Sequence, residues 1–149
     1  ISDWLIMKYY NKLSTIESIQ MFDIPHHIDD RGDLTVLQGN DFIPFSISRV
    51  FTVTASKNSV RGQHAHKKCS QFMVCLSGSI EVFCNDGDRQ INYLLDSPHL
   101  GLMLPPGVWA QETYKKDQSI LMVLCDLPYD EGDYIYSVND LIKFNRTKD

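Results

Sequence analysis

Short runs of Val, Ile, Leu, Phe and Thr recur along the chain from about residue 20 onward, with Gly, Pro, Asn and Asp between them. Runs of this length and composition predict β-strands joined by turns. Apolar Ile80, Val82 and Cys84 occupy alternate positions, as in a strand that is buried on one face. The Asp-Gly pair at 86–87 favours a hairpin turn, because both residues tolerate positive φ. The expected strands are 33–38, 47–55, 71–78, 79–87, 91–97, 101–107 and 119–128.

Two segments near the ends of the chain are expected to be helical, residues 9–19 and residues 138–144. Between them, many short strands at regular spacing are typical of a β-sandwich or a small barrel. The chain of 149 residues is long enough for one domain with its own core. We expect an N-terminal extension over residues 1–20, a candidate for a dimer contact, followed by one domain over residues 21–149.

Composition excludes several classes of protein. The net charge of −5 and the lack of a Lys/Arg run argue against nucleic-acid binding. The four cysteines form no C-x-x-C pair, so a zinc knuckle is not indicated. We find no signal peptide and no apolar stretch near the roughly 18 residues of a membrane span. These features predict a cytoplasmic protein with no membrane contact.

Two histidines, His64 and His66, are separated by one small residue. In a strand, such side chains point to the same face, roughly 6–7 Å apart. They are candidates for a metal site or for a proton-transfer pair. The surrounding spacing resembles the cupin pattern, in which His-x-His precedes a Glu and a later Pro-x-Gly precedes a third His. Here Gln71 stands in place of the Glu and Ala110 in place of the third His.

These two replacements bear on the metal. A divalent ion needs three or four ligands, and a carboxylate or a third imidazole to balance its charge. Two imidazoles and a neutral amide are a poor set, so we expect no metal and no other cofactor. An imidazole titrates near neutral pH and can act as a base and then as an acid without a metal.

A longer series of motifs narrows the resemblance. The stretches "DDRGDL", "PFSISRVF", "RGQHAHKK", "LSGSIEVFCNDG", "LDSPHLGLMLPPGVWAQE" and "LPYDEGDYIYSVNDLIKF" occur in this order over about residues 20–145. In this combination the chain resembles the WxcM-like cupins, which are sugar-nucleotide 3,4-ketoisomerases. The resemblance implies an all-β cupin, a double-stranded β-helix jelly roll with short terminal helices. It also implies a dTDP-sugar substrate, a homodimer, and a role in dideoxyaminosugar and surface polysaccharide (lipopolysaccharide O-antigen) synthesis.

The implied reaction moves the ketone of dTDP-4-keto-6-deoxy-D-glucose from C4 to C3. A proton leaves C3, an enediolate forms and a proton returns at C4, so nothing is oxidised overall. By resemblance, His64 is the base that removes the C3 proton, and His66 is the partner that relays a proton or holds a sugar oxygen.

Basic side chains are expected to bind the nucleotide. Guanidinium groups bind pyrophosphate oxygens in pairs, and the resemblance places Arg49 and Arg61 at the nucleotide and Arg31 near the sugar. Lys67 is a further candidate. Gln71, Glu112 and Asp30 are expected to complete the hydrogen-bond network.

Several points stay open on the sequence alone. Phe51 and Thr52 occupy a region where related enzymes often carry a tyrosine, and the tyrosines of the C-terminal tail are interpreted as packing or interface residues. Ala110 leaves the configuration at C4 open, galacto or gluco, and the nucleotide base is also open. The alternatives are a 3,5-epimerase acting on the same keto sugar and a non-catalytic cupin that binds a sugar nucleotide.

Overall fold

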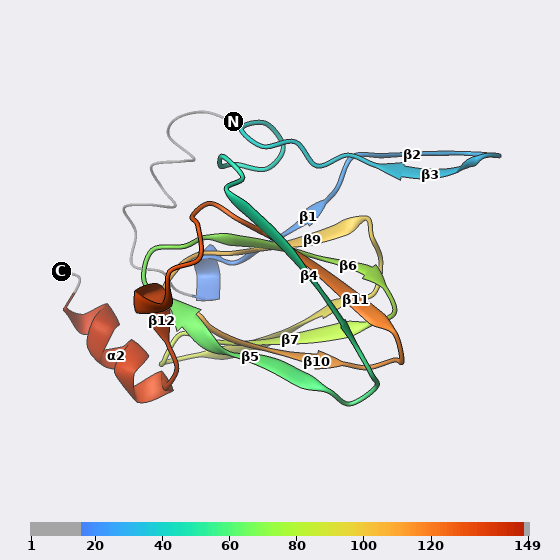
Figure 1. Cartoon of the computed structure of the whole chain (residues 1–149). Coiled ribbons are helices and arrows are strands. Elements are labelled where there is room, and N and C mark those ends of the chain that lie inside the picture. Colours follow the sequence, from blue (N-terminus) through green and yellow to red (C-terminus); the bar gives the residue numbers. More distant parts are fainter. Residues whose placement is uncertain (1–15, 148–149) are drawn as a thin grey trace.

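The computed structural model describes residues 16–147, and two five-stranded antiparallel sheets face each other in it (Figure 1). One sheet has the order β1 (Gln20–Asp23), β9 (Leu100–Leu104), β6 (Gln71–Ser77), β11 (Ser119–Cys125) and β4 (Arg49–Ala55). The other has the order β12 (Tyr134–Ile135), β5 (Val60–His66), β10 (Trp109–Tyr114), β7 (Ile80–Asn85) and β8 (Gln90–Leu95). This arrangement confirms the all-β prediction.

The main core lies between the two sheets. Ile80, Val82 and Cys84 of β7 are fully buried, as their alternation predicts, and they pack with Leu121 and Val123 of β11. Alternate side chains of one sheet therefore meet those of the other, which is how a sandwich buries its inner faces.

The outer face of the first sheet is buried as well. Phe72 and Val74 of β6 point away from the main core and pack with Ile43 and Phe45 of the segment between β3 and β4. Because apolar groups cover both of its faces, β6 is a nearly continuous apolar run instead of an alternating one.

A two-stranded hairpin, β2 (His26–Asp29) and β3 (Gly32–Thr35), extends away from the two sheets (Figure 1). All four residues of β2 are exposed. The predicted strand 33–38 therefore ends early, at Thr35, because it pairs with β2 alone and not with either large sheet.

The C-terminal helix α2 (Val138–Arg146) confirms the prediction for residues 138–144. Ser137 begins it as the N-cap, and its Oγ accepts a hydrogen bond from the Asp140 N–H at 3.0 Å. Buried Leu141 packs with Ala65 of β5 and Ile135 of β12. The helix thus holds β12 against the end of β5, where the two histidines lie.

The predicted helix over residues 9–19 falls largely outside the described residues. Its described part is a short 3₁₀ turn, η1 (Ile16–Ser18), and a second such turn is η2 (Glu131–Asp133). β1 begins directly after η1, at Gln20. No helix in the described range 16–147 is long and apolar enough to cross a membrane.

The pairing of β5 with β10 is irregular near the histidines. The register shifts between Ala110 and Gln111. On β5, Gly62 and Gln63 have φ of 83° and 62°, in the left-handed region. The bulge turns His64 and the side chains that precede it relative to the neighbouring strand.

Candidate active site

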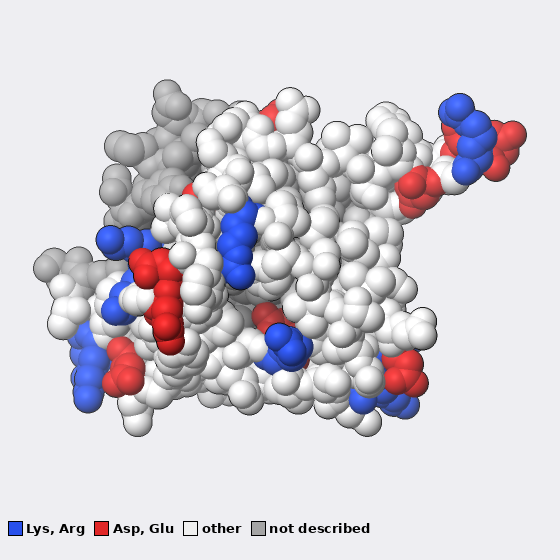
Figure 2. Space-filling view, viewed as in Figure 1, with Lys and Arg blue, Asp and Glu red and all other residues white. Residues whose placement is uncertain are grey.

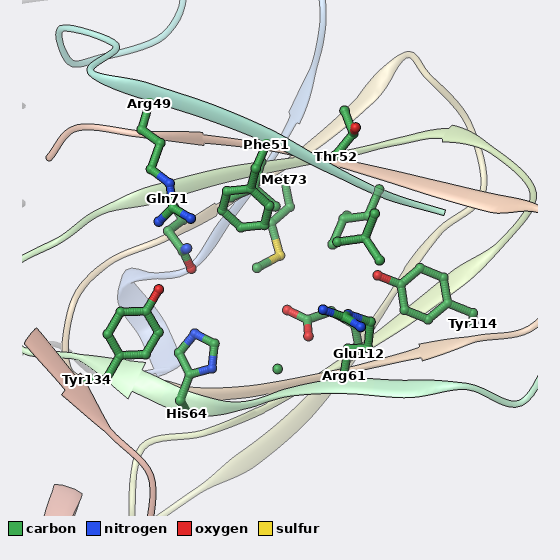
Figure 3. Close-up of a pocket in the computed structure, with 14 residues that line it drawn as sticks. Arg49, Phe51, Thr52, Arg61, His64, Gln71, Met73, Glu112, Tyr114 and Tyr134 are labelled. Carbon is green, nitrogen blue, oxygen red and sulfur yellow. The ribbon is translucent and has the colours of Figure 1, made fainter. Parts of the chain in front are cut away.

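A cavity of about 320 Å³ opens between the two sheets. Strands β4, β5, β6, β10, β11 and β12 all contribute side chains to it. Five of the predicted site residues line it together: Arg49, Arg61, His64, Gln71 and Glu112. Figure 3 shows His64 between Tyr134 and Glu112, with Arg49 and Gln71 across from it.

The two histidines lie side by side, as their spacing predicts. Their ring centroids are 5.0 Å apart and the ring planes are inclined by 83°. His64 is half-buried and lines the cavity, whereas His66 is buried and lies beside it at the end of β5. The imidazole of His64 therefore faces the cavity, and that of His66 packs beside it.

A buried carboxylate holds His66. Its Nδ1 donates to Oδ2 of Asp133 at 2.9 Å, and both side chains are 8% exposed. This contact fixes the tautomer, so the lone pair of the neutral ring lies on Nε2. The Nε2 atom is buried and has no hydrogen-bond partner in the structure.

Backbone groups in the turn after β5 form hydrogen bonds that hold Asp133 in place. Oδ1 of Asp133 accepts the N–H of Lys68 at 2.7 Å, and its Oδ2 accepts the N–H of Cys69 at 3.2 Å. The N–H of Lys67 donates to the carbonyl of Asp133 at 2.8 Å. The carboxylate is thus a pre-organised acceptor for His66, set by the loop between β11 and β12.

Both imidazoles are biased toward the neutral form. Burial lowers the pKa of His64, against an opposing hydrogen bond with the Gly62 backbone. Burial also lowers the pKa of His66, more than the contact with Asp133 raises it. A neutral imidazole has a free lone pair, which is the state that a general base needs.

Tyr134 covers both imidazoles. Its ring centroid lies 4.6 Å from that of His64 and 4.6 Å from that of His66. The tail tyrosine was interpreted as a packing residue, yet it also lines the cavity. It brings a phenol hydroxyl into the cavity, which Phe51 and Thr52, the β4 residues that also line it, do not provide.

Glu112 of β10 brings a carboxyl group into the same cavity. The residue is 5% exposed, and burial raises the pKa of its carboxyl to about 7, although its own backbone N–H and the positive Arg61 act in the opposite direction. In Figure 3 this carboxyl points into the cavity beside Arg61. A buried acid that is half-protonated near neutral pH is suited to proton transfer.

Two guanidinium groups flank the cavity. Arg49 of β4 lies over the rings of Phe51 and Tyr129, at 4.8 Å and 5.0 Å from the centroids. Arg61 of β5 lies near Glu112 (Figure 3). Figure 2 shows basic atoms on both sides of a hollow on this face of the molecule, with acidic atoms deep between them.

Two predicted ligand-binding residues lie outside the cavity lining. Arg31 lies between β2 and β3, at the turn of the hairpin, and its guanidinium pairs with Asp29 at 2.6 Å with 85% of its side chain exposed. Lys67 is exposed beyond the end of β5, because the strand ends at His66 and the chain turns there. The structure therefore does not bring these two residues to the other candidates within one chain.

One of the histidines belongs to a group of three candidate metal ligands. Candidate ligand atoms of His66, Cys69 and Asp133 lie within 4.8 Å of one another. Hydrogen bonds account for this proximity, because the two oxygens of Asp133 already accept three N–H groups. Contact with the Cys125 thiol and burial raise the pKa of Cys69, so this thiol keeps its proton in the structure as it stands.

Sequence reasoning missed Asp133 and did not assign Tyr134 to the site. Both lie in the tail that follows β11, about 70 residues after the histidines along the chain, and they reach the site because β12 pairs with β5 in the register Tyr134 to His66. A two-residue strand carries almost no periodic signal, so the pattern could not reveal it.

Comparisons with known proteins agree with this geometry. The TDP-4-oxo-6-deoxy-α-D-glucose-3,4-oxoisomerase of Aneurinibacillus thermoaerophilus is 42% identical over 118 residues, which are 78% of this chain and 85% of that protein. The crystal structure of QdtA, a sugar 3,4-ketoisomerase from Thermoanaerobacterium thermosaccharolyticum in complex with TDP, matches with a TM-score of 0.85. That pair is 31% identical over 90% of this chain and 98% of the other.

A histidine-to-asparagine mutant of the same enzyme, in complex with TDP-4-keto-6-deoxyglucose, matches with a TM-score of 0.85, 30% identity and coverage of 90% of this chain and 98% of that one. These fold matches confirm the predicted jelly-roll class. The sequence profile of the FdtA family, described as "WxcM-like, C-terminal", matches residues 17–146. The chain therefore belongs to the FdtA family of WxcM-like proteins.

Proposed function

We propose that this chain is a TDP-sugar 3,4-ketoisomerase, which moves the ketone of TDP-4-keto-6-deoxyglucose from C4 to C3. The observation that carries the proposal is the pair of adjacent imidazoles at one cavity, with the ring of His64 facing that cavity and that of His66 held by Asp133. Relatives at 42% and 31% identity are a TDP-4-oxo-6-deoxyglucose 3,4-oxoisomerase and a sugar 3,4-ketoisomerase bound to TDP.

The two imidazoles transfer the carbon-bound proton. His64 takes the proton from C3, which the neighbouring ketone acidifies, and the electrons of the C–H bond move into a C3–C4 enediolate. A proton then returns to C4 while the ketone forms at C3. His64 is assigned this step because it faces the cavity and its pKa is lowered. His66, whose Nε2 is free, acts as its partner in the relay.

We assign the pyrophosphate to Arg49 and Arg61. A nucleoside diphosphate sugar carries two negative charges, and guanidinium groups bind such oxygens through paired N–H donors. Both residues flank the cavity that holds His64. Gln71, 7% exposed and lining the same cavity, supplies an amide for a sugar oxygen. Thymidine as the base rests on the relatives alone.

The reaction needs no metal. It neither oxidises nor reduces the substrate overall, and the positions that would complete a cupin metal site are Gln71 and Ala110. We place the reaction in the cytoplasm, which suits the four free thiols of the described residues. The 3-ketone is a substrate for an aminotransferase, which fits the synthesis of dideoxyaminosugars for surface polysaccharides.

We also propose a homodimer in which the β2–β3 hairpin contacts a second copy. Ile28 and Leu34 of this hairpin are 67% and 61% exposed in one chain. An isolated two-stranded hairpin is only marginally stable, so it is expected to pack against a partner. Arg31 lies at the turn of this hairpin, so it could contact substrate only in the cavity of the second copy. Light scattering should find a dimer that becomes a monomer in the Ile28→Asp, Leu34→Asp variant.

In the matched control Leu94→Asp, on β8, the dimer should persist. If the hairpin variant remains a dimer and the Leu94→Asp control dissociates, the dimer interface lies at β8 and not at the hairpin.

The activity itself is tested with protein treated with a chelator and incubated with TDP-4-keto-6-deoxyglucose. Proton and carbon NMR should show a 3-keto product, and the coupling between H4 and H5 gives the C4 configuration. A C5 epimer of the 4-keto sugar would support the epimerase alternative. Bound sugar nucleotide without any turnover would support the non-catalytic alternative.

A further inference from the structure

The imidazole pair accounts for protons on carbon but not for those on oxygen. In the proposed reaction the C3 hydroxyl loses its proton to become a carbonyl, and the C4 carbonyl oxygen gains one to become a hydroxyl. These two oxygens are neighbours on the sugar ring. A group that can give a proton to one oxygen and take a proton from the other would complete the reaction without net change in itself.

Glu112 is placed for this role. Its carboxyl lies in the cavity against β5, the strand that carries His64. A Cβ at Gly62 would lie 2.1 Å from Oε2 of Glu112, so the carboxyl occupies space that the glycine leaves open. Figure 3 shows the carboxyl directed toward the same part of the cavity as the His64 ring.

Packing does not explain why an acid stands at this position. Glu112 is 5% exposed, and none of the ion pairs within residues 16–147 includes it. Burying an acid without a salt bridge destabilises the fold. Its neighbour Tyr114 lines the same cavity and has a buried hydroxyl without a hydrogen-bond partner. The two groups leave polar atoms available to a ligand at this end of the cavity.

We propose that Glu112 is a catalytic residue that shuttles the proton between the substrate's C3 and C4 oxygens; this proposal rests on the ketoisomerase function given above. The protonated carboxyl gives its proton to the C4 oxyanion of the first enediolate. The resulting carboxylate takes the proton of the C3 hydroxyl, which leaves the oxyanion on C3. That oxyanion becomes the C3 carbonyl when C4 is protonated, and Glu112 ends in the state in which it began.

The chemistry of a carboxyl group suits two adjacent oxygens. When it is protonated, one oxygen donates while the other accepts, and once the proton has left, both oxygens can accept it back. Burial favours the protonated form of Glu112 at neutral pH, when an exposed glutamate would be ionised. The shuttle therefore begins in the state that the environment stabilises.

The test separates the two halves of the reaction in Glu112→Gln. The amide can still donate a hydrogen bond to the C4 oxygen but cannot transfer a proton. In D2O we expect exchange of the C3 proton to stay within a few-fold of the unchanged enzyme, while formation of the 3-keto product falls by about 10²–10⁴-fold. Glu17→Gln, an exposed glutamate paired with Arg89, is the matched control and should change neither rate.

Product formation at the original rate in folded Glu112→Gln would overturn the shuttle, and so would equal loss of exchange and isomerisation with TDP still bound. If this variant does not fold, Glu112→Asp is used instead. It keeps the carboxyl group, but the shorter side chain moves that group away from the substrate's oxygens. The ratio of isomerisation to exchange should then fall, and an unchanged ratio would also overturn the proposal. Failure of the unchanged enzyme to isomerise would instead count against the proposed function.

Discussion

Oδ2 of Asp133 lies 2.9 Å from Nδ1 of His66, and both residues are buried. The contact joins two residues that lie 67 positions apart in the sequence. It gives His66 one tautomer and one orientation. The backbone N–H groups of Lys68 and Cys69 hold the carboxylate, so it cannot turn away from the ring.

Replacing Asp133 by Asn should therefore reduce kcat by at least about 10²-fold, with a smaller effect on the Kd for TDP. An amide N–H in place of the carboxylate oxygen would face Nδ1 and favour the other tautomer, which removes the lone pair from Nε2. Steady-state kinetics and calorimetric titration with TDP measure the two quantities. Asp88→Asn, in the exposed turn between β7 and β8, is the control. Full activity in Asp133→Asn would show that the tautomer of His66 is immaterial.

The two imidazoles can be told apart by exchange. Because His64 faces the cavity, His64→Asn should abolish exchange of the C3 proton with D2O, whereas His66→Asn should slow it and leave it measurable. NMR of the substrate measures this rate in each variant. Exchange that survives in His64→Asn and disappears in His66→Asn would transfer the role of base to His66.

Arg49 should matter for nucleotide binding. Arg49→Ala should raise the Kd for TDP by about tenfold or more, because charge-assisted hydrogen bonds contribute roughly 1.5–3 kcal/mol. Calorimetric titration gives the value. Arg146→Ala, at the end of α2 and away from the cavity lining, is the matched change and should leave the Kd unaltered. An unchanged Kd in Arg49→Ala would remove this residue from the pyrophosphate site.

Gly62 should not tolerate a side chain. Its φ is +83°, and a Cβ would meet Oε2 of Glu112 at 2.1 Å. We expect Gly62→Ala to lower the free energy of unfolding by about 1–3 kcal/mol and to reduce kcat by displacing Glu112. Gly32→Ala is the control, since φ there is also positive at +140° but nothing lies within 4 Å. Urea unfolding and steady-state kinetics measure both variants. Backbone strain should destabilise both, whereas only Gly62→Ala should also lower kcat through the clash with Glu112.

Burial of Glu112 predicts how stability depends on pH. Its pKa in the folded chain is about 7, against an ordinary value of 4.5, so the folded state binds more protons than the unfolded state between these pH values. The contribution of this group is favourable at low pH and is lost as the pH rises through about 7. The loss is on the order of 3 kcal/mol, at about 1.4 kcal/mol for each pH unit.

Glu112→Gln should therefore be more stable than the unchanged protein at pH 8, with the gain shrinking toward pH 4.5. Urea unfolding at several pH values measures this difference. A gain that is constant with pH would mean that the carboxyl keeps an ordinary pKa in the folded chain.

How far the sequence predicts the structure depends on the kind of signal. The alternation in β7 and the long apolar run of β6 predicted their strands, because burial imposes those patterns directly. The strand β10 was missed, since the polar residues Gln111, Glu112 and Thr113 interrupt its apolar positions. Of these three, Glu112 is the one on the buried face of β10, and it lines the cavity.

The candidate site was predictable where neighbours in sequence are neighbours in space. His64 and His66 share a face of one strand, and their spacing alone predicted this. Asp133 and Tyr134 reach them through a long-range pairing that no local pattern encodes. The position of Arg31 could not be predicted either. No pattern in the neighbouring sequence shows that the β2–β3 hairpin pairs with neither of the two large sheets.

The most direct test of the central claim is the fate of the C3 proton in D2O, followed by NMR with protein stripped of metal. We expect the unchanged enzyme to convert TDP-4-keto-6-deoxyglucose to the 3-keto sugar at the same rate with and without chelator, and the folded His64→Asn, His66→Asn double variant to bind TDP yet leave the C3 proton in place. Turnover by the double variant, or activity in the unchanged enzyme that vanishes on chelation and returns with a divalent metal, would contradict proton transfer by the imidazole pair.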